Sequence, residues 1–236
     1  MDPRLDHTLN WPRQGAPTLL SLQLMPERAA FNPATSTLFV ADVHLGKAAV
    51  FRARGLPVPQ GTTTGTLARL SRALDRCQAR RLVVLGDFLH ARESHASGTL
   101  AALSAWRQRH PRLICLVVEG NHDLHAGRVQ ASFDIQSSTE PHVEGFLRGV
   151  HHPPEPGHHA PPGVLTLAGH VHPVFHLRSR TDSLRLPVFW LRQGVLTLPA
   201  FGEFTGGFAI NAATNPGDEV FVVSEQVQPL ALSAEQ

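Results

Sequence analysis

Aspartate, asparagine and histidine side chains gather at four points along this 236-residue chain, which has 15 histidines in all. Each cluster follows a short apolar run, and the clusters are Asp42-Val43-His44, Gly86-Asp87, Gly120-Asn121-His122-Asp123 and Gly169-His170-Val171-His172. Carboxylate, amide and imidazole groups suit Mn²⁺, Fe²⁺ or Zn²⁺, and no thiolate is among them. The clusters offer more ligands than one ion needs, and two ions that share Asp87 would use them all.

The apolar runs before these clusters predict the elements that position them. The runs over 38–41, 82–85, 114–118 and 164–167 are short and mostly aliphatic, as buried strands are. Helical spacing of apolar residues, seen over 62–78 and 98–109, separates the first three runs. Alternating strands and helices predict an α/β fold with a largely parallel sheet. Ligands of such sheets bind beyond the carboxyl ends of the strands, where all four clusters fall.

The remaining segments predict further strands and a loop. Short apolar runs separated by Gly and Pro occur from Pro187 onward and indicate a second sheet, with which the segment 19–31 is expected to pair. Residues 149–163 are rich in Pro and His and are expected to form a loop. A stripe of arginines at helical spacing is typical of a solvated helix face, and it comprises Arg69, Arg72, Arg76 and Arg80.

Composition bounds the class of protein. Hydrophobic residues make up 42% of the chain and charged residues 17%, which excludes charged, low-hydrophobicity disorder. A chain of this length can bury a sizeable core, so we expect one domain over residues 1–236, with 1–17 and 225–236 loosely ordered. Cys77 and Cys115 lie among apolar neighbours, which predicts buried, reduced thiols. The formal net charge of +2 does not by itself indicate a nucleic-acid partner.

Several function classes lack support in the sequence. No stretch approaches the length of apolar residues that a transmembrane helix needs, and the first residues include no apolar signal region. We therefore expect a cytoplasmic protein with no membrane partner. Neither the G-x-S-x-G turn of acyl-transfer enzymes nor the G-x-x-x-x-G-K-[ST] loop of nucleotide-driven proteins occurs.

The ordered set of clusters resembles the calcineurin-like metallophosphoesterase superfamily, whose pattern is D-x-H, G-D, G-N-H-[DE], a lone H and G-H-x-H. The matching region spans residues 38–172 and includes a histidine of His151-His152. A second likeness lies in Asp42-Val43-His44-Leu45-Gly46-Lys47, followed by Phe51-Arg52 and by residues 55–61. That stretch is similar to the ligase-associated DNA-damage-response endonuclease branch of the superfamily.

The resemblance implies a fold and a set of ligands. The implied fold is a four-layer αββα sandwich, in which two mixed β-sheets lie face to face with helices outside. One ion would be bound by Asp42, His44, Asp87 and His172, and the other by Asp87, Asn121, His170 and one histidine of the 151–152 pair. Both His151 and His152 fit the family's spacing, and His151 is favoured because it lies closer to the apolar run that ends at Val150.

The same resemblance implies a phosphodiesterase or nuclease. Two divalent cations, with Mn²⁺ favoured and Fe²⁺ or Zn²⁺ as alternatives, would hold a bridging hydroxide near Asp87 for in-line attack on the phosphorus. His122 would not be a ligand but would protonate the leaving group, and Asp123 would orient its ring. The basic residues Lys47, Arg52 and Arg54 follow the first ligand pair on an expected loop and could hold DNA phosphates.

Two other functions remain open on the same scaffold. One is a phosphomonoesterase or nucleotide phosphatase, and the other is a scaffold protein without catalysis, although every ligand position here is filled. A protein phosphatase is disfavoured because the chain lacks that branch's Arg-Gly pair and has Asp123 after the Gly-Asn-His triplet. Membership in the repair branch implies DNA as substrate and an association with a DNA ligase, an exonuclease and a helicase. The sequence does not indicate an oligomeric state.

Overall fold

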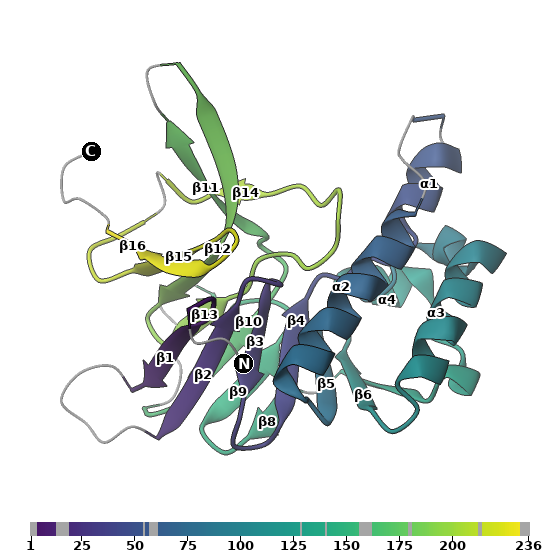
Figure 1. The fold of residues 1–236 in the computed structure, drawn as a ribbon, viewed down its shortest axis with the longest axis horizontal. Helices are drawn as coiled ribbons and strands as arrows, with labels where there is room; N and C mark the ends of the chain where they lie inside the picture. The colour runs from purple at the N-terminus through teal and green to yellow at the C-terminus, as the bar shows by residue number, and fades with distance from the viewer. Residues whose placement is uncertain are drawn as a thin grey trace.

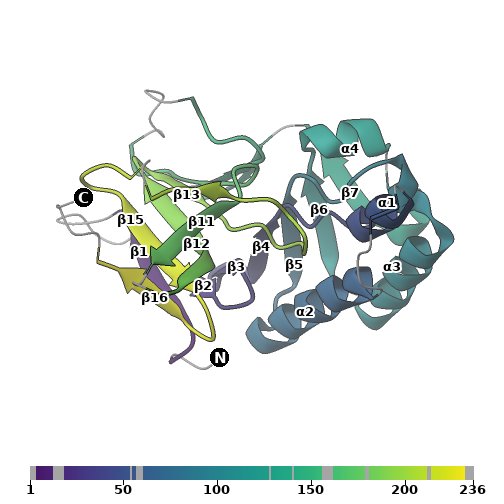
Figure 2. The same cartoon turned by 90° about the horizontal axis from the view of Figure 1, so that it is seen from above.

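The structure is a computed structural model of the 236-residue chain. It describes residues 4–12, 19–53, 55–56, 61–127, 129–139, 141–155, 162–178, 181–211 and 214–231. Two β-sheets face each other, and a group of helices lies on one side of the pair (Figures 1 and 2).

The first sheet has seven strands whose order in space is their order in the chain. Its members are β1 (His7–Trp11), β2 (Leu20–Met25), β3 (Ala29–Asn32), β4 (Thr37–Ala41), β5 (Arg81–Leu85), β6 (Ile114–Val118) and β7 (Ile135–Ser138). The pairs from β1 to β4 are antiparallel, and the pairs from β4 to β7 are parallel. The strands predicted over 38–41, 82–85 and 114–118 therefore lie in the parallel half of a mixed sheet, and the one predicted over 164–167 is β10 (Leu165–Ala168) of the other sheet.

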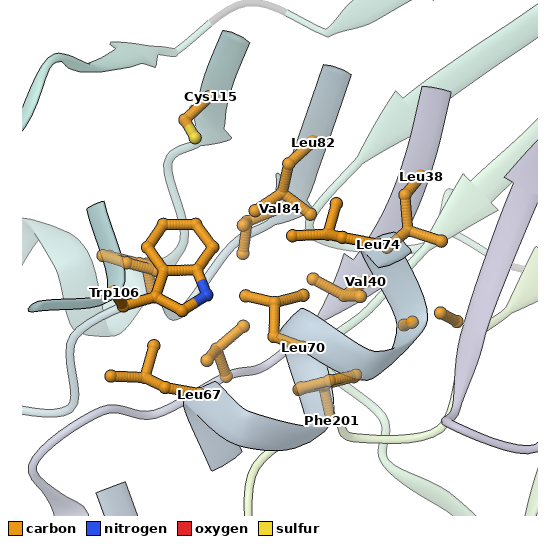
Figure 3. Close-up of a cluster of buried hydrophobic side chains, with 14 of the residues drawn as sticks. Leu38, Val40, Leu67, Leu70, Leu74, Leu82, Val84, Trp106, Cys115 and Phe201 are labelled. Carbon is orange, nitrogen blue, oxygen red and sulfur yellow. The ribbon is translucent and has the colours of Figure 1, made fainter. Parts of the chain in front are cut away.

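Helices cover the outer face of this sheet. The described helices are α1 (Lys47–Ala53), α2 (Thr62–Cys77), α3 (Ser97–Arg109) and α4 (Asn121–Ala126), with short 3₁₀ turns η1 (Arg92–His95) and η2 (Ala131–Phe133). α2 and α3 match the two predicted helices to within about a residue. The buried stripe of α2, which includes Leu67, Leu70 and Leu74, packs against side chains of β4 and β5 beside Trp106 of α3 (Figure 3).

The second sheet is also mixed. It comprises β8 (His142–Glu144), β9 (Leu147–Val150), β10 (Leu165–Ala168), β11 (Pro173–Arg178), β12 (Ser183–Arg192), β13 (Val195–Thr197), β14 (Phe208–Ala209), β15 (Glu219–Val223) and β16 (Val227–Leu230). Its main path runs β14-β11-β12-β13-β10-β9-β8, with β15 paired to β12 and β16 paired to β15. The central strands β9, β10 and β13 are parallel to one another.

Apolar side chains from the facing sides of both sheets form one core. Phe39 and Leu85 of the first sheet belong to the same buried cluster as Leu167, Phe189 and Phe221 of the second. The predicted sandwich of two mixed sheets is thus confirmed, with a layer of helices outside the first sheet. The described helices all lie on the side of the first sheet in Figure 2. The opposite face of the second sheet is covered by a small cluster, which comprises Val188, Trp190, Ile210 and Val220.

Two placements differ from the sequence-based expectation. The segment 19–31 forms β2 and most of β3, which belong to the first sheet and not to the second. A turn of four residues joins β3 to β4, and so short a connection makes the two strands antiparallel neighbours. The expected loop over 149–163 also begins later than predicted, because β9 extends to Val150 and pairs with β10.

The chain ends are more ordered than expected. Residues 7–11 form β1 on the edge of the first sheet, and 227–230 form β16 on β15, so loose order over 1–17 and 225–236 is wrong for these two stretches. Backbone pairing explains both, and the Val227 N–H also donates to the Leu5 carbonyl at 2.9 Å. Residues 1–3, 13–18 and 232–236 lie outside the described part.

The arginine stripe on α2 is not uniformly solvated. Arg76 donates to the carboxylates of Asp6 and Glu27, with Nη2–oxygen distances of 2.7 and 2.6 Å, and so ties the chain start to α2. The side chain of Arg69 is only 16% exposed. Both cysteines are buried free thiols, as predicted. None of the helices in the described residues has the length and apolarity to cross a membrane.

The helix–sheet core gives a stability prediction. Leu70 is fully buried on α2, so Leu70→Ala is expected to lower the free energy of unfolding by roughly 2–5 kcal/mol, through lost burial and a residual cavity. Leu184→Ala on β12 is a matched control, because that side chain is 55% exposed and its loss is expected to cost about 0.5 kcal/mol or less. Chemical denaturation measures both, and equal losses would contradict this account of the core.

Candidate metal centre

All seven residues predicted as metal ligands lie at carboxyl ends of strands and come together. In the first sheet, Asp42 and His44 follow β4, Asp87 follows β5, and Asn121 follows β6. In the second sheet, His151 follows β9, and His170 and His172 follow β10. The segment after β13 joins the two edges, because the Phe201 and Gly202 N–H groups donate to the carbonyls of Ala41 and Asp42. The centre is therefore built between the sheets.

One group of ligand atoms is buried and has unused hydrogen-bonding capacity. The Nε2 atom of His172 lies 3.4 Å from Oδ1 of Asp42, and the ligand atoms of Asp42, His44 and His172 lie within 4.8 Å of one another. Asp42 Oδ1, His44 Nε2 and His172 Nε2 are buried with no hydrogen-bond partner. Buried polar atoms rarely lack partners in proteins, and three convergent acceptors fit a cation.

A second group adjoins the first. The Nε2 atom of His151 lies 3.0 Å from Oδ1 of Asn121 and 3.2 Å from Nδ1 of His170. The Nδ1 atom of His151 lies 3.1 Å from the Leu85 carbonyl, which fixes the proton on Nδ1 and leaves the Nε2 lone pair free. This hydrogen bond aims His151 into the centre as a metal ligand would be aimed.

Asp87 faces both groups. Its Oδ2 atom lies 3.7 Å from Nε2 of His44, and its Oδ1 atom lies 3.6 Å from Nε2 of His151. The His122 backbone N–H also donates to Oδ1 at 2.9 Å. The carboxylate therefore has the orientation that a shared ligand requires.

Burial keeps the imidazoles in the form that binds cations. Burial lowers the pKa of His44 well below its usual range, and it lowers the pKa of His151 to about 4. Burial and the neighbouring His152 also lower the pKa of His170. Neutral imidazole is the metal-binding species, so these shifts favour a cation near neutral pH.

The backbone at the centre adopts a conformation that side chains normally avoid. Five of the seven predicted ligands have left-handed φ values, namely Asp42 at 54°, His44 at 49°, Asp87 at 50°, His170 at 67° and His172 at 52°. Such residues are uncommon and cost free energy, and they concentrate at functional sites. The strain turns successive side chains inward at the strand ends.

Three glycines allow the ligand loops to approach closely. A methyl group at Gly86 would overlap the His151 ring, and one at Gly120 would overlap the Asp87 carboxylate. A methyl group at Gly169 would lie 2.7 Å from the Leu85 carbonyl. The glycines of the sequence motifs are therefore required by packing between ligands.

The structure separates the two candidate histidines of the 151–152 pair. His151 is 3% exposed and contacts Asn121, whereas His152 is exposed and packs its ring 4.2 Å from that of His170. His151 is therefore the more deeply placed of the two, and the ligand atoms of His151, His152 and His170 lie within 4.8 Å of one another.

His122 is oriented by a different group from the one expected. Its Nδ1 atom lies 2.9 Å from the His90 carbonyl. The two Asp123 oxygens instead accept the N–H groups of Leu89 and Gly120, at 3.1 and 3.0 Å. Asp123 therefore holds the backbone around the site, while the contact of the His122 ring is with the His90 carbonyl. Burial raises the pKa of this carboxyl group to about 6.

His90 is a site residue that the sequence analysis did not assign. Its Nδ1 atom lies 3.3 Å from Nδ1 of His44, and its ring stacks on His122 with centroids 4.8 Å apart. The available signal was a further histidine three residues after Asp87. Its position beside His44 and His122 could not be read from that spacing alone.

The predicted phosphate-binding residues are only partly placed. Lys47 and Arg52 lie on α1 and not on a loop, because the helix begins directly after Gly46. Burial lowers the pKa of Lys47, and the carboxylates of Asp87 and Asp42 act in the opposite direction, which puts the ammonium group in their field. Arg52 is exposed, and Arg54 lies outside the described residues.

The sandwich of two mixed sheets, with Asp, Asn and His side chains gathered at the strand ends, is the arrangement of a metal-binding phosphoesterase. Residues 35–207 match the family model described as calcineurin-like phosphoesterase, and the chain belongs to this family. The chain is similar to the structure of Pseudomonas putida nuclease MPE, with 41% identity, a TM-score of 0.79, and coverage of 95% of this chain and 100% of that one.

One further solved structure is less similar to this chain. A structure of Yfce, a phosphoesterase from E. coli, shares 14% identity, with a TM-score of 0.40 over 80% of this chain and 87% of that one. A search of curated proteins found no match.

The orientation of Asp87 predicts its effect on metal content. Asp87→Asn removes the charge that both groups would share, so elemental analysis after loading with Mn²⁺ is expected to show much less than two ions per chain. Asp75→Asn, an equal charge change on the exposed surface of α2, is the control and is expected to match the wild type. Near-full loading of Asp87→Asn at both positions would contradict a shared ligand.

Proposed function

We propose that this phosphoesterase hydrolyses phosphodiester bonds of DNA with two divalent cations. The observation that carries the proposal is the pair of adjacent ligand groups, with the buried carboxylate of Asp87 turned toward both. The likeness to Pseudomonas putida nuclease MPE over nearly the whole chain supports a nucleic-acid substrate. When bound, two cations neutralise phosphate oxygens and activate the attacking water.

The proposed ligand sets follow the two groups. Asp42, His44, Asp87 and His172 would hold one ion, and Asp87, Asn121, His151 and His170 would hold the other. Both sets contain only oxygen and nitrogen donors, which suits Mn²⁺ and is compatible with Fe²⁺ or Zn²⁺. Of these, Mn²⁺ is the metal that we propose.

His122 would act as the general acid. Its Nδ1–H group donates to the His90 carbonyl, which orients the ring and leaves the Nε2 side for the leaving oxygen. Asp123 would act indirectly, because it anchors the backbone at Gly120 and Leu89. Lys47, in the field of Asp87 and Asp42, would bind a non-bridging phosphate oxygen. Arg52 and Arg54 would bind phosphates further along the DNA strand.

The cellular role is part of the same proposal. The likeness of residues 42–61 to the ligase-associated endonuclease branch supports a role in DNA repair in the cytoplasm. A DNA ligase, an exonuclease and a helicase would then act on the same lesions.

Substrate preference tests the proposed function. With Mn²⁺, the enzyme is expected to cleave single-stranded DNA and bis(p-nitrophenyl) phosphate, and to act more slowly on p-nitrophenyl phosphate at equal concentration. Colorimetric release and gel analysis measure the three rates, and Asp87→Asn controls for a contaminating phosphatase. Much faster turnover of the monoester would favour a phosphomonoesterase instead.

The position of His122 predicts a dependence on the leaving group. His122→Ala is expected to keep its metal and to lose on the order of 10²–10⁴ in rate on DNA, whose alkoxide leaving group needs a proton. The loss on bis(p-nitrophenyl) phosphate is expected to be small, because nitrophenolate leaves without one. His125→Ala, an exposed histidine on the same helix, is the control.

Two outcomes would change the role of His122. Equal losses on both substrates would indicate stabilisation of charge and not proton donation. Loss of bound metal in the variant would identify His122 as a ligand.

A further inference from the structure

A cavity of about 520 Å³ opens beside the metal centre and shares His172 with it. It lies between α2, the turn before β3, the β11–β12 hairpin and the segment after β13. Its lining includes Arg28, Arg69, Arg185, Glu203 and Phe204. Its described lining residues therefore include three guanidinium groups and one carboxylate.

Arg69 is built into this cavity. It hydrogen-bonds to the Phe201 carbonyl, its guanidinium carbon lies 4.7 Å from the centre of the Phe201 ring, and Nη1 lies 3.7 Å from Oε1 of Glu203. Its Nε atom is buried with no hydrogen-bond partner. The guanidinium group of Arg69 is therefore held in place, and its Nε–H group remains without an acceptor.

Arg28 and Arg185 add positive charge to the same space. The Nη1 group of Arg28 donates to the Ala200 carbonyl at 3.4 Å. The guanidinium of Arg185 lies against Gly207, where any side chain would overlap it. Burial, together with the repulsion of Arg28, lowers the pKa of Arg69 to about 10. Mutual repulsion between these arginines, which Glu203 and the nearby Glu27 only partly offset, favours a bound anion.

Phe204 supplies a flat apolar surface at the cavity. Its ring is 47% exposed, and its φ value of 56° is one that a bulky side chain rarely adopts. An exposed aromatic ring beside basic side chains is the arrangement on which the bases of single-stranded nucleic acids stack.

We propose that this cavity binds the nucleotide next to the scissile phosphate of a single-stranded DNA substrate, with its phosphate on Arg28, Arg69 and Arg185 and its base on Phe204. The inference rests on the proposed function. Because His172 belongs both to the cavity and to the metal centre, a strand with one phosphate at the metal ions can extend directly into the cavity. A small aryl diester has no second phosphate and would leave the cavity empty.

The experiment compares two substrates on the Mn²⁺-loaded full chain. For Arg185→Gln and Arg28→Gln, the kcat/KM on a single-stranded oligodeoxynucleotide, divided by that on bis(p-nitrophenyl) phosphate, is expected to fall by about tenfold, the usual worth of a charged hydrogen bond. Phe204→Ala is expected to lower the same ratio. Glu203→Gln is expected to raise it, because the carboxylate repels phosphate.

Arg112→Gln is the matched control. Arg112 is exposed just before β6, at the amino ends of the strands and away from the metal centre, so its loss is expected to leave the ratio unchanged. The salt dependence adds a second measurement, since each lost phosphate contact on a single strand lowers the slope of log affinity against log salt by about 0.7.

The outcomes separate the two proposals. If the wild type cleaves the aryl diester but not the oligonucleotide, the proposed function fails. If the wild type cleaves both substrates and the Arg185 and Arg28 variants keep the wild-type ratio and salt slope, only the nucleotide subsite fails. Equal losses on both substrates would also overturn the subsite, because they would show that the arginines support the metal centre.

Discussion

Three buried atoms without hydrogen-bond partners, Asp42 Oδ1, His44 Nε2 and His172 Nε2, set the main constraint on this structure. A buried acceptor without a hydrogen-bond partner is energetically unfavourable. A bound cation would satisfy all three atoms at once. The surrounding features serve that requirement. Left-handed backbone at five ligands turns the side chains inward, and burial keeps the imidazoles neutral. Gly86, Gly120 and Gly169 leave the space that the ligands occupy.

The sandwich architecture explains how the polar ligand side chains can lie together without disrupting the apolar core. Each sheet contributes parallel strands whose carboxyl ends share an edge, and the apolar cluster between the sheets lies below that edge. The segment after β13 then bridges the two edges through the Ala41 and Asp42 carbonyls. This bridge also forms one wall of the arginine-lined cavity, so metal binding and the proposed strand path depend on the same ten residues or so of backbone.

The sequence predicted those parts of the site that depend on local order. Asp42, Asp87 and His170 follow apolar runs, and parallel strands necessarily bring such positions to one edge. Other features depend on tertiary packing. The His90 carbonyl orients His122, and Asp123 anchors backbone, because both contacts cross between loops. The arginine cavity joins residues from four separate segments and has no short motif. β2 and β3 belong to the first sheet and not to the second, the sheet expected for 19–31, because a turn of four residues pairs β3 with β4.

Strand order in the first sheet has a consequence for how the chain acquires its metal centre. Every strand from β1 to β7 pairs with its neighbour in the chain, so the first sheet is built from contacts between successive segments. The ligands are not local: the His170 N–H reaches the Asp42 carboxylate across 128 positions of sequence. The complete set of ligands therefore exists only once the second sheet, which carries His151, His170 and His172, has packed on the first. The proposed catalysis thus depends on the association of the two sheets and not on the first sheet alone.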